Sequence, residues 1–326
     1  MAKISDWDDY IGRRLRLRDL RVFFAVVQAG SLTKAAAQLR VSQPAVSQVI
    51  ADLEHALGVK LFDRSSRGVE PTAYARALLA RGRAAFDELR QGIRDIEFLT
   101  DATAGEIAVG YPESIGTNIL PQMIARFSER YPRVVIRTDV VPSPALNFAG
   151  LRERTHDLVL ARMPTPLLAG YSVDDLSVEV LFDDPLVVVA GAQSTWARRR
   201  KVDLADLIDE PWILSPPGTL THTRVVEAFK ALGLEGPRAG LVTFALDLRV
   251  KLPPMGRFVT AVPQSALRLG GDRAALKILP VVFPFRPWPV AILTLKGRTL
   301  SPVVERFIAC AREVAKEFAG PARTRT

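Results

Sequence analysis

The sequence predicts a multidomain protein with an N-terminal winged helix-turn-helix, a long linker helix and a C-terminal α/β domain. Three observations carry this prediction. The chain of 326 residues is too long for one ordinary hydrophobic core. Apolar residues follow a helical period up to about residue 103. Beyond it, stretches typical of strands alternate with helical stretches.

The composition is that of a soluble globular protein, with 48% hydrophobic and 24% charged residues. The apolar runs are too short to span a bilayer, and the start MAKISDWDDY is unlike a secretory signal. The single cysteine, Cys310, excludes an internal disulfide and fits a reducing compartment. It falls in the apolar pattern of a C-terminal helix, where we expect it to be buried. These features predict a cytoplasmic protein.

Positive charge is concentrated near the N-terminus. Residues 13–83 contain 13 Lys and Arg against 5 Asp and Glu, in a chain whose net charge is +9. The other 255 residues therefore carry a net charge of only +1. A basic block at one end indicates a polyanionic partner, although a merely solvated basic surface has the same composition. The pattern within the block decides between the two interpretations.

Three short helices are predicted inside this basic block. Apolar residues at i, i+3, i+4 and i+7 mark the first: Leu20, Phe23, Phe24 and Val27. A second helix runs from about Thr33 to Arg40. After a tight turn, Ser42 is suited to cap a third helix and Pro44 fits its first turn. Two short helices around a brief turn predict a helix-turn-helix at about residues 32–51, whose second helix enters the major groove of DNA.

The outer face of the third helix carries polar residues that the core does not need. Glutamine can pair with adenine through two hydrogen bonds, and serine can reach a base or a phosphate. A strand at Lys60–Asp63, a polar turn and a return at Val69–Glu70 predict a hairpin wing beside the sugar-phosphate backbone. The predicted DNA-binding residues are Thr33, Gln43, Pro44, Ser47, Gln48, Arg64 and Arg67. An ordinary polar surface remains the alternative for the helix.

A long helix is predicted from Thr72 to about Asp101, with a seam of apolar and small residues at spacings of four and three. Gly82 and Gly92 lie in this seam and would let a second backbone approach closely. The predicted dimerisation residues are Leu78, Ala85, Leu89, Ile96 and Leu99. Packing of the helix within its own chain is the alternative.

Residues 20–75 resemble the DNA-binding domain of the LysR-type transcriptional regulators. The resemblance rests on the segment GSLTKAAAQLRVSQPAVSQVIADLEHALGVKLFDRSSRGVEPTAYA (30–75) and extends over the whole chain in domain order and length. The sequence departs from the family in about 15 extra N-terminal residues, which include Arg13-Arg14. It also has Ala73-Tyr74-Ala75 where the family usually has Ala-Gly after the threonine.

The resemblance implies a homo-oligomer, a dimer or a tetramer, with a C-terminal effector-binding domain. In the family that domain has two α/β lobes similar to those of periplasmic solute-binding proteins. The implied domains are an extension (1–14), the winged helix-turn-helix (15–72), the linker or coiled-coil helix (73–103) and the effector domain (104–320). Within the effector domain, lobe I comprises about 104–182 and 286–320, and lobe II comprises about 183–285.

The pattern after residue 104 predicts parallel sheets with helices on their faces. The expected strands are Glu106–Gly110, Val134–Val140, Asp157–Ala161, Pro185–Ala190, Trp212–Leu214, Leu241–Thr243, Phe258–Val262 and Val290–Leu295. Ligands of such sheets bind beyond the carboxyl ends of strands. That rule selects as effector-binding residues Ser114, Ser143, Arg162, Ser215, Thr219 and Thr243. Arg162 could pair with an anionic group, and a loop-capping role stays open for each of the six.

Motifs of catalysis are missing from the sequence: it has no G-x-S-x-G, G-x-G-x-x-G, P-loop or H-E-x-x-H. The three histidines are isolated from one another, so we expect no metal site, no cofactor and no enzyme activity. The expected partners are double-stranded DNA at a partly palindromic promoter site and a small-molecule effector. RNA polymerase is a further candidate partner, and no membrane is expected. The alternative functions are a DNA-binding protein without effector sensing and, as the runner-up class, an enzyme.

Overall fold

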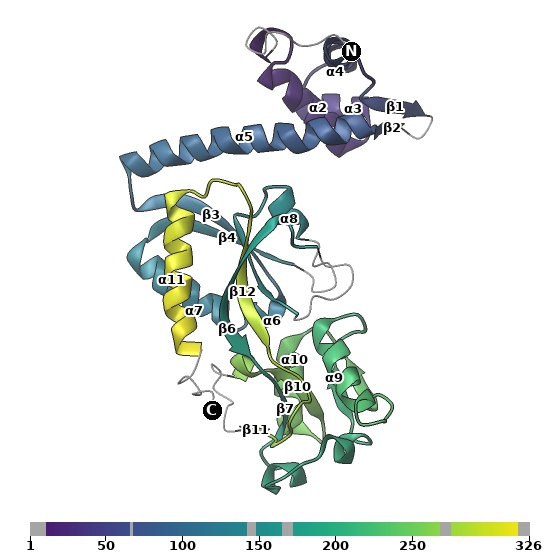
Figure 1. Ribbon diagram of the computed structural model, residues 1–326, viewed down its shortest axis with the longest axis vertical. Coiled ribbons are helices and arrows are strands. Elements are labelled where there is room, and N and C mark those ends of the chain that lie inside the picture. The colour runs from purple at the N-terminus through teal and green to yellow at the C-terminus, as the bar shows by residue number, and fades with distance from the viewer. Residues whose placement is uncertain (1–10, 66–67, 142–147, 165–171, 268–274, 319–326) are drawn as a thin grey trace. The chain divides into compact units, whose positions relative to one another are not determined.

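The computed structural model describes residues 11–65, 68–141, 148–164, 172–267 and 275–318. The chain divides into two compact units, residues 1–90 and 91–326, and each is described separately. Figure 1 shows the elements of both units along the chain. In the part of the chain that is described, no helix is both long and apolar enough to cross a bilayer.

The first unit is built on the helices α2 (Leu17–Ala29), α3 (Leu32–Leu39) and α4 (Gln43–Leu57). Its core is a single apolar cluster in which Phe23, Val26 and Ala35 are fully buried. Ser31 and Ser42 cap α3 and α4, since each hydroxyl accepts a backbone N–H of the first turn. The turn between these two helices contains Arg40 in the left-handed region, at φ 58°. The predicted helix-turn-helix is therefore formed.

The wing is an antiparallel hairpin of β1 (Phe62–Ser65) and β2 (Gly68–Pro71). The amide of Val69 donates to the carbonyl of Gly30 at 3.1 Å, which ties the wing to the end of α2. Gly68 lies so close to that carbonyl that a Cβ there would meet the oxygen at 2.6 Å. At the other end of the hairpin, the buried carboxylate of Glu54 accepts the amide of Leu61 at 2.8 Å and the amine of Lys60 at 2.6 Å. The wing is therefore held at both ends.

The long helix α5 (Ala73–Thr100) corresponds to the predicted linker helix. In the first unit its seam packs within the chain, because Leu78 joins the helix-turn-helix core. A Cβ on Gly82 would meet the Phe24 ring at 2.8 Å. The expectation that Gly82 admits the backbone of a second chain is therefore wrong, because its own α2 occupies that space. Gly92 has open space around its Cα, with nothing within 4 Å of a Cβ built there.

The second unit contains two five-stranded sheets among its described residues, which we call the first and second lobes (Figure 1). The first lobe has the strand order β4-β3-β5-β12-β6. Its elements are β3 (Ala104–Tyr111), α6 (Glu113–Gly116), α7 (Ile119–Arg130), β4 (Arg133–Val140), α8 (Ala149–Arg152), β5 (Leu158–Arg162), β6 (Leu176–Asp184), β12 (Trp288–Leu295) and α11 (Pro302–Phe318). The core of this lobe lies between the sheet and α7 and α11, and it includes Cys310, which is buried as predicted.

The second lobe has the strand order β11-β7-β10-β8-β9. Its strands are β7 (Leu186–Gly191), β8 (Trp212–Leu214), β9 (Ala239–Val242), β10 (Val259–Pro263) and β11 (Leu276–Ile278). Its helices are α9 (Leu220–Lys230) and α10 (Leu246–Lys251), with 3-10 turns η2 (Thr195–Arg198), η3 (Leu204–Leu207), η4 (Pro253–Met255) and η5 (Gln264–Leu267). The core of the lobe is centred on Trp212 and Phe229, whose rings pack edge to face with centroids 5.7 Å apart.

The sheets are mixed, so the expectation of parallel sheets holds for only some of their strands. β3, β4 and β5 are parallel, but β12 runs antiparallel to both β5 and β6. In the second lobe β7 is antiparallel to β10 and β11. The reason is the two crossovers: the chain leaves the first lobe along β6 and returns along β12, so these paired strands run in opposite directions (Figure 1). The sequence pattern did not indicate β6, β11 or α10.

Glu54 provides a test of how the wing is held. Burial alone would raise the pKa of its carboxyl, but the hydrogen bonds from Lys60, Leu61 and Phe62 together lower the pKa. The ionised Glu54 carboxylate therefore stabilises the folded state, and this stabilisation is fully present above the ordinary glutamate pKa of about 4.3. It is lost as the pH falls through the lower pKa of the folded state.

We expect Glu54→Ala to destabilise the wing by about 1–3 kcal/mol at neutral pH, because two amides and an amine lose a charged acceptor. Hydrogen–deuterium exchange of peptides covering residues 54–72 measures the effect. Glu54→Gln, which keeps one acceptor oxygen, is the milder control. Equal exchange in wild type and Glu54→Ala at pH 7 would contradict this role.

Candidate nucleic-acid interface and ligand cleft

One face of α4 is exposed and polar while the other is buried. Val46, Ile50 and Leu53 are each about 1% exposed and hold the helix on the core. The predicted base-reading residues lie on the outer face: Gln43, Pro44 and Gln48 are exposed, and Ser47 is half-buried. Thr33 is also exposed, at the start of α3. The helix thus separates packing residues from residues that are free to contact a partner.

Local contacts already constrain one member of this set. The side-chain amide of Gln48 donates to Asp52 at 2.8 Å, one turn later in α4. Its carbonyl oxygen and second N–H are left for a base, whereas Asp52 brings a carboxylate close to the same surface. Arg64 lies in β1 of the wing. Arg67 lies outside the described residues.

A cleft of about 280 Å³ lies between the two lobes of the second unit. The first lobe contributes Pro112, Glu113, Ser114, Val140 and Val141 to its wall, and the second contributes Ser215, Thr219, Thr221, Phe244 and Arg249. The strand-end rule thus selected Ser114, Ser215 and Thr219 among its lining residues. Thr243 precedes the lining residue Phe244, and its hydroxyl accepts the amide of Ala245 within a local turn. Ser143 lies outside the described residues.

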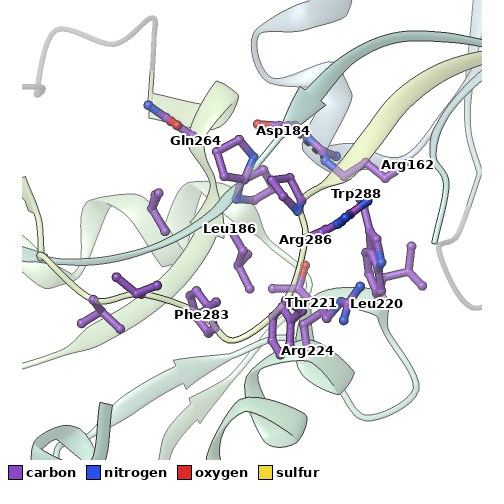
Figure 2. A pocket seen from close by; sticks show the side chains of 17 residues that line it. Arg162, Asp184, Leu186, Leu220, Thr221, Arg224, Gln264, Phe283, Arg286 and Trp288 are labelled. Carbon is purple, nitrogen blue, oxygen red and sulfur yellow. Dashed lines mark hydrogen bonds and ion pairs between the residues drawn. The ribbon is translucent and has the colours of Figure 1, made fainter. Parts of the chain in front are cut away.

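The side chain of Arg162 does not line this cleft but donates a hydrogen bond to Ser114, which does. It forms a buried ion pair with Asp184 at 2.5 Å (Figure 2) and donates to the hydroxyl of Ser114 at 2.6 Å. Asp184 in turn accepts the hydroxyl and the amide of Ser265 in the second lobe, at 2.7 and 2.9 Å. The side chain of Asn118 donates to the carbonyls of Ser265 and Ala266. A continuous network of hydrogen bonds therefore connects Ser114 in the cleft wall to residues of both lobes.

Thr219 mainly has a capping role. Its hydroxyl accepts the amide of His222 in the first turn of α9 and donates to the carbonyl of Pro216 at 2.8 Å. Ser114 differs, because its oxygen accepts from Arg162 and its O–H is left to donate. Of these two hydroxyls, that of Ser114 is the better placed to contact a ligand.

The charged group that sequence reasoning missed is Arg249. It is 5% exposed in α10, it lines the cleft, and it donates to the carbonyl of Ala261. Its Nε has no hydrogen-bond partner among the described residues. Burial lowers the pKa of Arg249 to about 10, although the carboxylate of Glu113 favours the charged form. A signal existed in the sequence, because Arg249 follows Leu246 by three positions and shares its inward helical face.

Family models match both parts of the chain. Residues 17–76 match the bacterial regulatory helix-turn-helix protein model of the lysR family, and residues 100–316 match the LysR substrate binding domain. The protein belongs to the LysR family. This LysR-type protein is therefore a DNA-binding transcriptional regulator with a domain for a small-molecule effector, and the sequence-based resemblance is confirmed. Its relatives are regulators and not enzymes, which excludes the enzymatic alternative.

Relatives span nearly the whole chain. The transcriptional regulator GbpR of Azospirillum brasilense is 28% identical over 309 residues, covering 94% of this chain and 88% of GbpR. The RuBisCO operon transcriptional regulator of Allochromatium vinosum is 30% identical over 293 residues, covering 89% and 93%. Each match therefore covers most of this LysR-type regulator and most of its relative.

Solved structures share the fold. A full-length OxyR variant from Pseudomonas aeruginosa aligns with a TM-score of 0.66 at 22% identity, covering 95% of this chain and 98% of OxyR. The LysR family regulator CbnR aligns with a TM-score of 0.59 at 22% identity, covering 92% and 99%. The predicted architecture, a helix-turn-helix followed by a two-lobed α/β domain, is thereby confirmed.

Proposed function

We propose that this LysR-type regulator responds to a small carboxylate that binds in the cleft between its lobes. The observation that carries the proposal is Arg249, a buried cation whose Nε lacks a partner among the described residues. A buried guanidinium with an unused N–H is stabilised by an anionic acceptor, and a carboxylate matches its planar geometry. The cleft volume of about 280 Å³ suits a small metabolite.

The rest of the wall limits which acids fit. Glu113 carries a negative charge at the mouth and accepts the amide of Leu246 at 3.1 Å. It disfavours a second carboxylate nearby and favours a ligand with a hydroxyl or amino group. Val140, Val141 and Phe244 supply apolar surface, and Ser114 supplies a donor. We infer a monocarboxylate with a short, partly polar body.

Because such a ligand contacts both lobes, its affinity depends on how the two lobes are arranged relative to one another. It would interact through Arg249 in the second lobe and Ser114 in the first. A ligand changes the function only if it binds one arrangement of the lobes more tightly than another. Ser114 is hydrogen-bonded to Arg162, so a ligand on Ser114 also bears on the network that joins the lobes.

DNA reading is assigned in this proposal to the exposed face of α4. Gln43, Ser47 and Gln48 would contact base edges, while Thr33 and Pro44 would lie near the backbone. Arg64 and Arg67 of the wing would contact phosphates. The exposure of Gln43 and Gln48 on the outer face of α4 supports this division.

Self-association is assigned to the C-terminal half of α5. Its apolar side chains Leu89, Ile93, Ile96 and Leu99 are 51–84% exposed and follow one helical stripe. On the opposite side of the helix, Phe98 packs on the core of the first lobe and Arg94 pairs with Asp157 at 3.1 Å. The stripe is therefore left for a second copy, which would place Leu89, Ile96 and Leu99 in the interface, and Ala85 at its edge. We place the assembled regulator in the cytoplasm, with RNA polymerase as a further partner.

The base-reading role predicts a loss that depends on DNA sequence. Gln43→Ala should weaken binding to the specific promoter site by about 1–3 kcal/mol and leave binding to random DNA nearly unchanged. Arg64→Ala should weaken binding to both the specific site and random DNA. It should also lower the number of counterions released on binding by about one, which reduces the slope of affinity against salt concentration. Fluorescence anisotropy on both DNAs measures these effects, with Gln28→Ala on the exposed side of α2 as the control. Equal losses on both DNAs for Gln43→Ala would contradict base reading.

The α5 stripe predicts how assembly fails. Leu89→Asp would bring a charge into an apolar interface, so we expect monomers that bind the promoter poorly. Ala80→Asp is the control, because it adds the same charge to the same helix. Ala80 is nine residues from Leu89, which places it on the opposite face, so this variant should leave assembly intact. Light scattering reports the molar mass of each. An intact dimer of Leu89→Asp would move the interface elsewhere.

The cleft proposal predicts that Arg249 is needed for the response to acids. A thermal-shift screen of small hydroxy, amino and keto monocarboxylates should identify a stabilising compound for the wild type. Arg249→Met should weaken its binding about tenfold or more, because a charge-assisted hydrogen bond is lost. Promoter binding without ligand should persist, as footprinting would show. An acid that binds Arg249→Met as tightly as wild type would refute the assignment.

A further inference from the structure

The segment that leads into α2 is rich in arginine, and the proposed function makes no use of it. Residues 13–21 contain one acid, Asp19, and five arginines, all of them exposed: Arg13, Arg14, Arg16, Arg18 and Arg21. The first three arginines precede residue 17, where the match to the helix-turn-helix family model begins. They therefore lie outside the matched domain.

Residues 11–16, which we call the arginine turn, are folded against the first unit. Leu15 packs on the apolar core of the helix-turn-helix. The amide of Gly12 donates to the carbonyl of Leu15 at 3.0 Å, and Gly12 has a φ of 110°, which other residues rarely adopt. Nε of Arg16 donates to the carbonyl of Arg13 at 3.1 Å. Because the turn is fixed in this way, binding through its arginines costs less conformational entropy than binding through a flexible tail.

α2 connects the arginine turn to the wing. The turn adjoins the first residue of α2, and the carbonyl of Gly30 at the other end accepts the amide of Val69 from β2 at 3.1 Å. The 13 residues of the helix span about 20 Å, which is the length of about six base pairs. α4 packs against α2. The arginine turn and the wing therefore lie at opposite ends of the helix that supports α4.

The charge of this segment calls for an anionic partner. Arg18 pairs with Asp19 at 3.3 Å, but five arginines against one acid leave a net charge of +4 in residues 13–21. A guanidinium matches a phosphate group with two parallel N–H donors. B-DNA presents one negative charge per about 1.7 Å of its axis. Charge complementarity therefore favours the phosphates of the DNA to which this domain binds.

We propose that the arginine turn is an additional DNA-contacting surface, which binds backbone phosphates on the side of each half-site opposite to the wing. With α4 in the major groove and the wing on one flank, the turn reaches the other flank. Such contacts carry no sequence information, so they add affinity on any DNA and widen the footprint. The inference rests on DNA binding by the domain, and it is independent of the base-reading residues and of the effector.

The salt dependence of binding tests the contact with phosphates. A double variant, Arg13→Gln with Arg14→Gln, removes two charges from exposed side chains. Fluorescence anisotropy of the full-length protein measures its affinity for the promoter site and for random DNA. We expect the slope of log affinity against log salt concentration to fall by about two, and the affinity at low salt to fall about fivefold or more. The loss should be equal on both DNAs, because backbone contacts do not depend on sequence.

Two matched variants and a stability measurement serve as controls. Arg13→Lys with Arg14→Lys keeps the charge and should keep the salt slope. Arg198→Gln with Arg200→Gln removes two exposed charges from the second unit and should leave the slope unchanged. The melting temperature of the double Gln variant should match that of the wild type, because the two substituted side chains are exposed.

Directed cleavage tests where the arginine turn lies on the DNA. Cys310 is the only cysteine of the chain and is buried, so Arg14→Cys accepts a single iron–EDTA label, which cleaves the DNA strands near it. Glu70→Cys places the same label on the exposed side of the wing. On the promoter site, the cuts from the two labels should fall on opposite sides of each half-site, about six base pairs apart.

Each outcome supports or overturns the proposal. A lower salt slope for the double Gln variant, a retained slope for the double Lys variant and cleavage from Arg14→Cys on the flank opposite to the wing support it. An unchanged slope for the double Gln variant would overturn it, and this is the result expected if the acids Asp6, Asp8 and Asp9 neutralise the arginines. A loss of slope in the double Lys variant, with a lower melting temperature, would assign the arginines to folding and also overturn it. Cleavage from Glu70→Cys without cleavage from Arg14→Cys would refute the placement on DNA.

Discussion

The effector domain depends on one buried ion pair. Arg162 ends a central strand of the first lobe, and Asp184 stands at the last residue before the chain crosses to the second. Taking these charges out of water is costly, and removing one partner would leave the other uncompensated. The cost is offset by hydrogen bonds to Ser114 and Ser265, which lie in different lobes. The same bonds that solvate the pair therefore fix how the lobes meet.

The cleft can be understood from this arrangement. Ser114 in its wall accepts a hydrogen bond from Arg162, so a rearrangement of the ion pair changes a contact of the cleft. Ligand coupling requires an element that can switch between two packed arrangements, and a hydrogen-bonded network that spans both lobes is suited to that role. In contrast, the core of each lobe is apolar and shares no side chain with the pair.

Local rules were enough to predict the helix-turn-helix, because caps and apolar spacing act within a few residues. Ser42 stands where the cap was expected. The strand-end rule selected Ser114, Ser215 and Thr219, which line the cleft, and also Arg162, whose side chain instead pairs with Asp184, 22 residues away. Arg249 was missed because its burial depends on tertiary packing. The sequence pattern placed β12 but not its antiparallel direction, because strand direction is set by where the chain returns, which periodicity does not encode.

The division of α4 into two faces has an evolutionary consequence. Val46, Ile50 and Leu53 anchor the helix together with the buried Glu54, and the outward residues contribute little to folding. With base reading assigned to Gln43 and Gln48 as proposed, substitutions there would change which operators are read at little cost in stability. Related regulators would then diverge in their regulons by changes on this one surface, without compensating changes in the core.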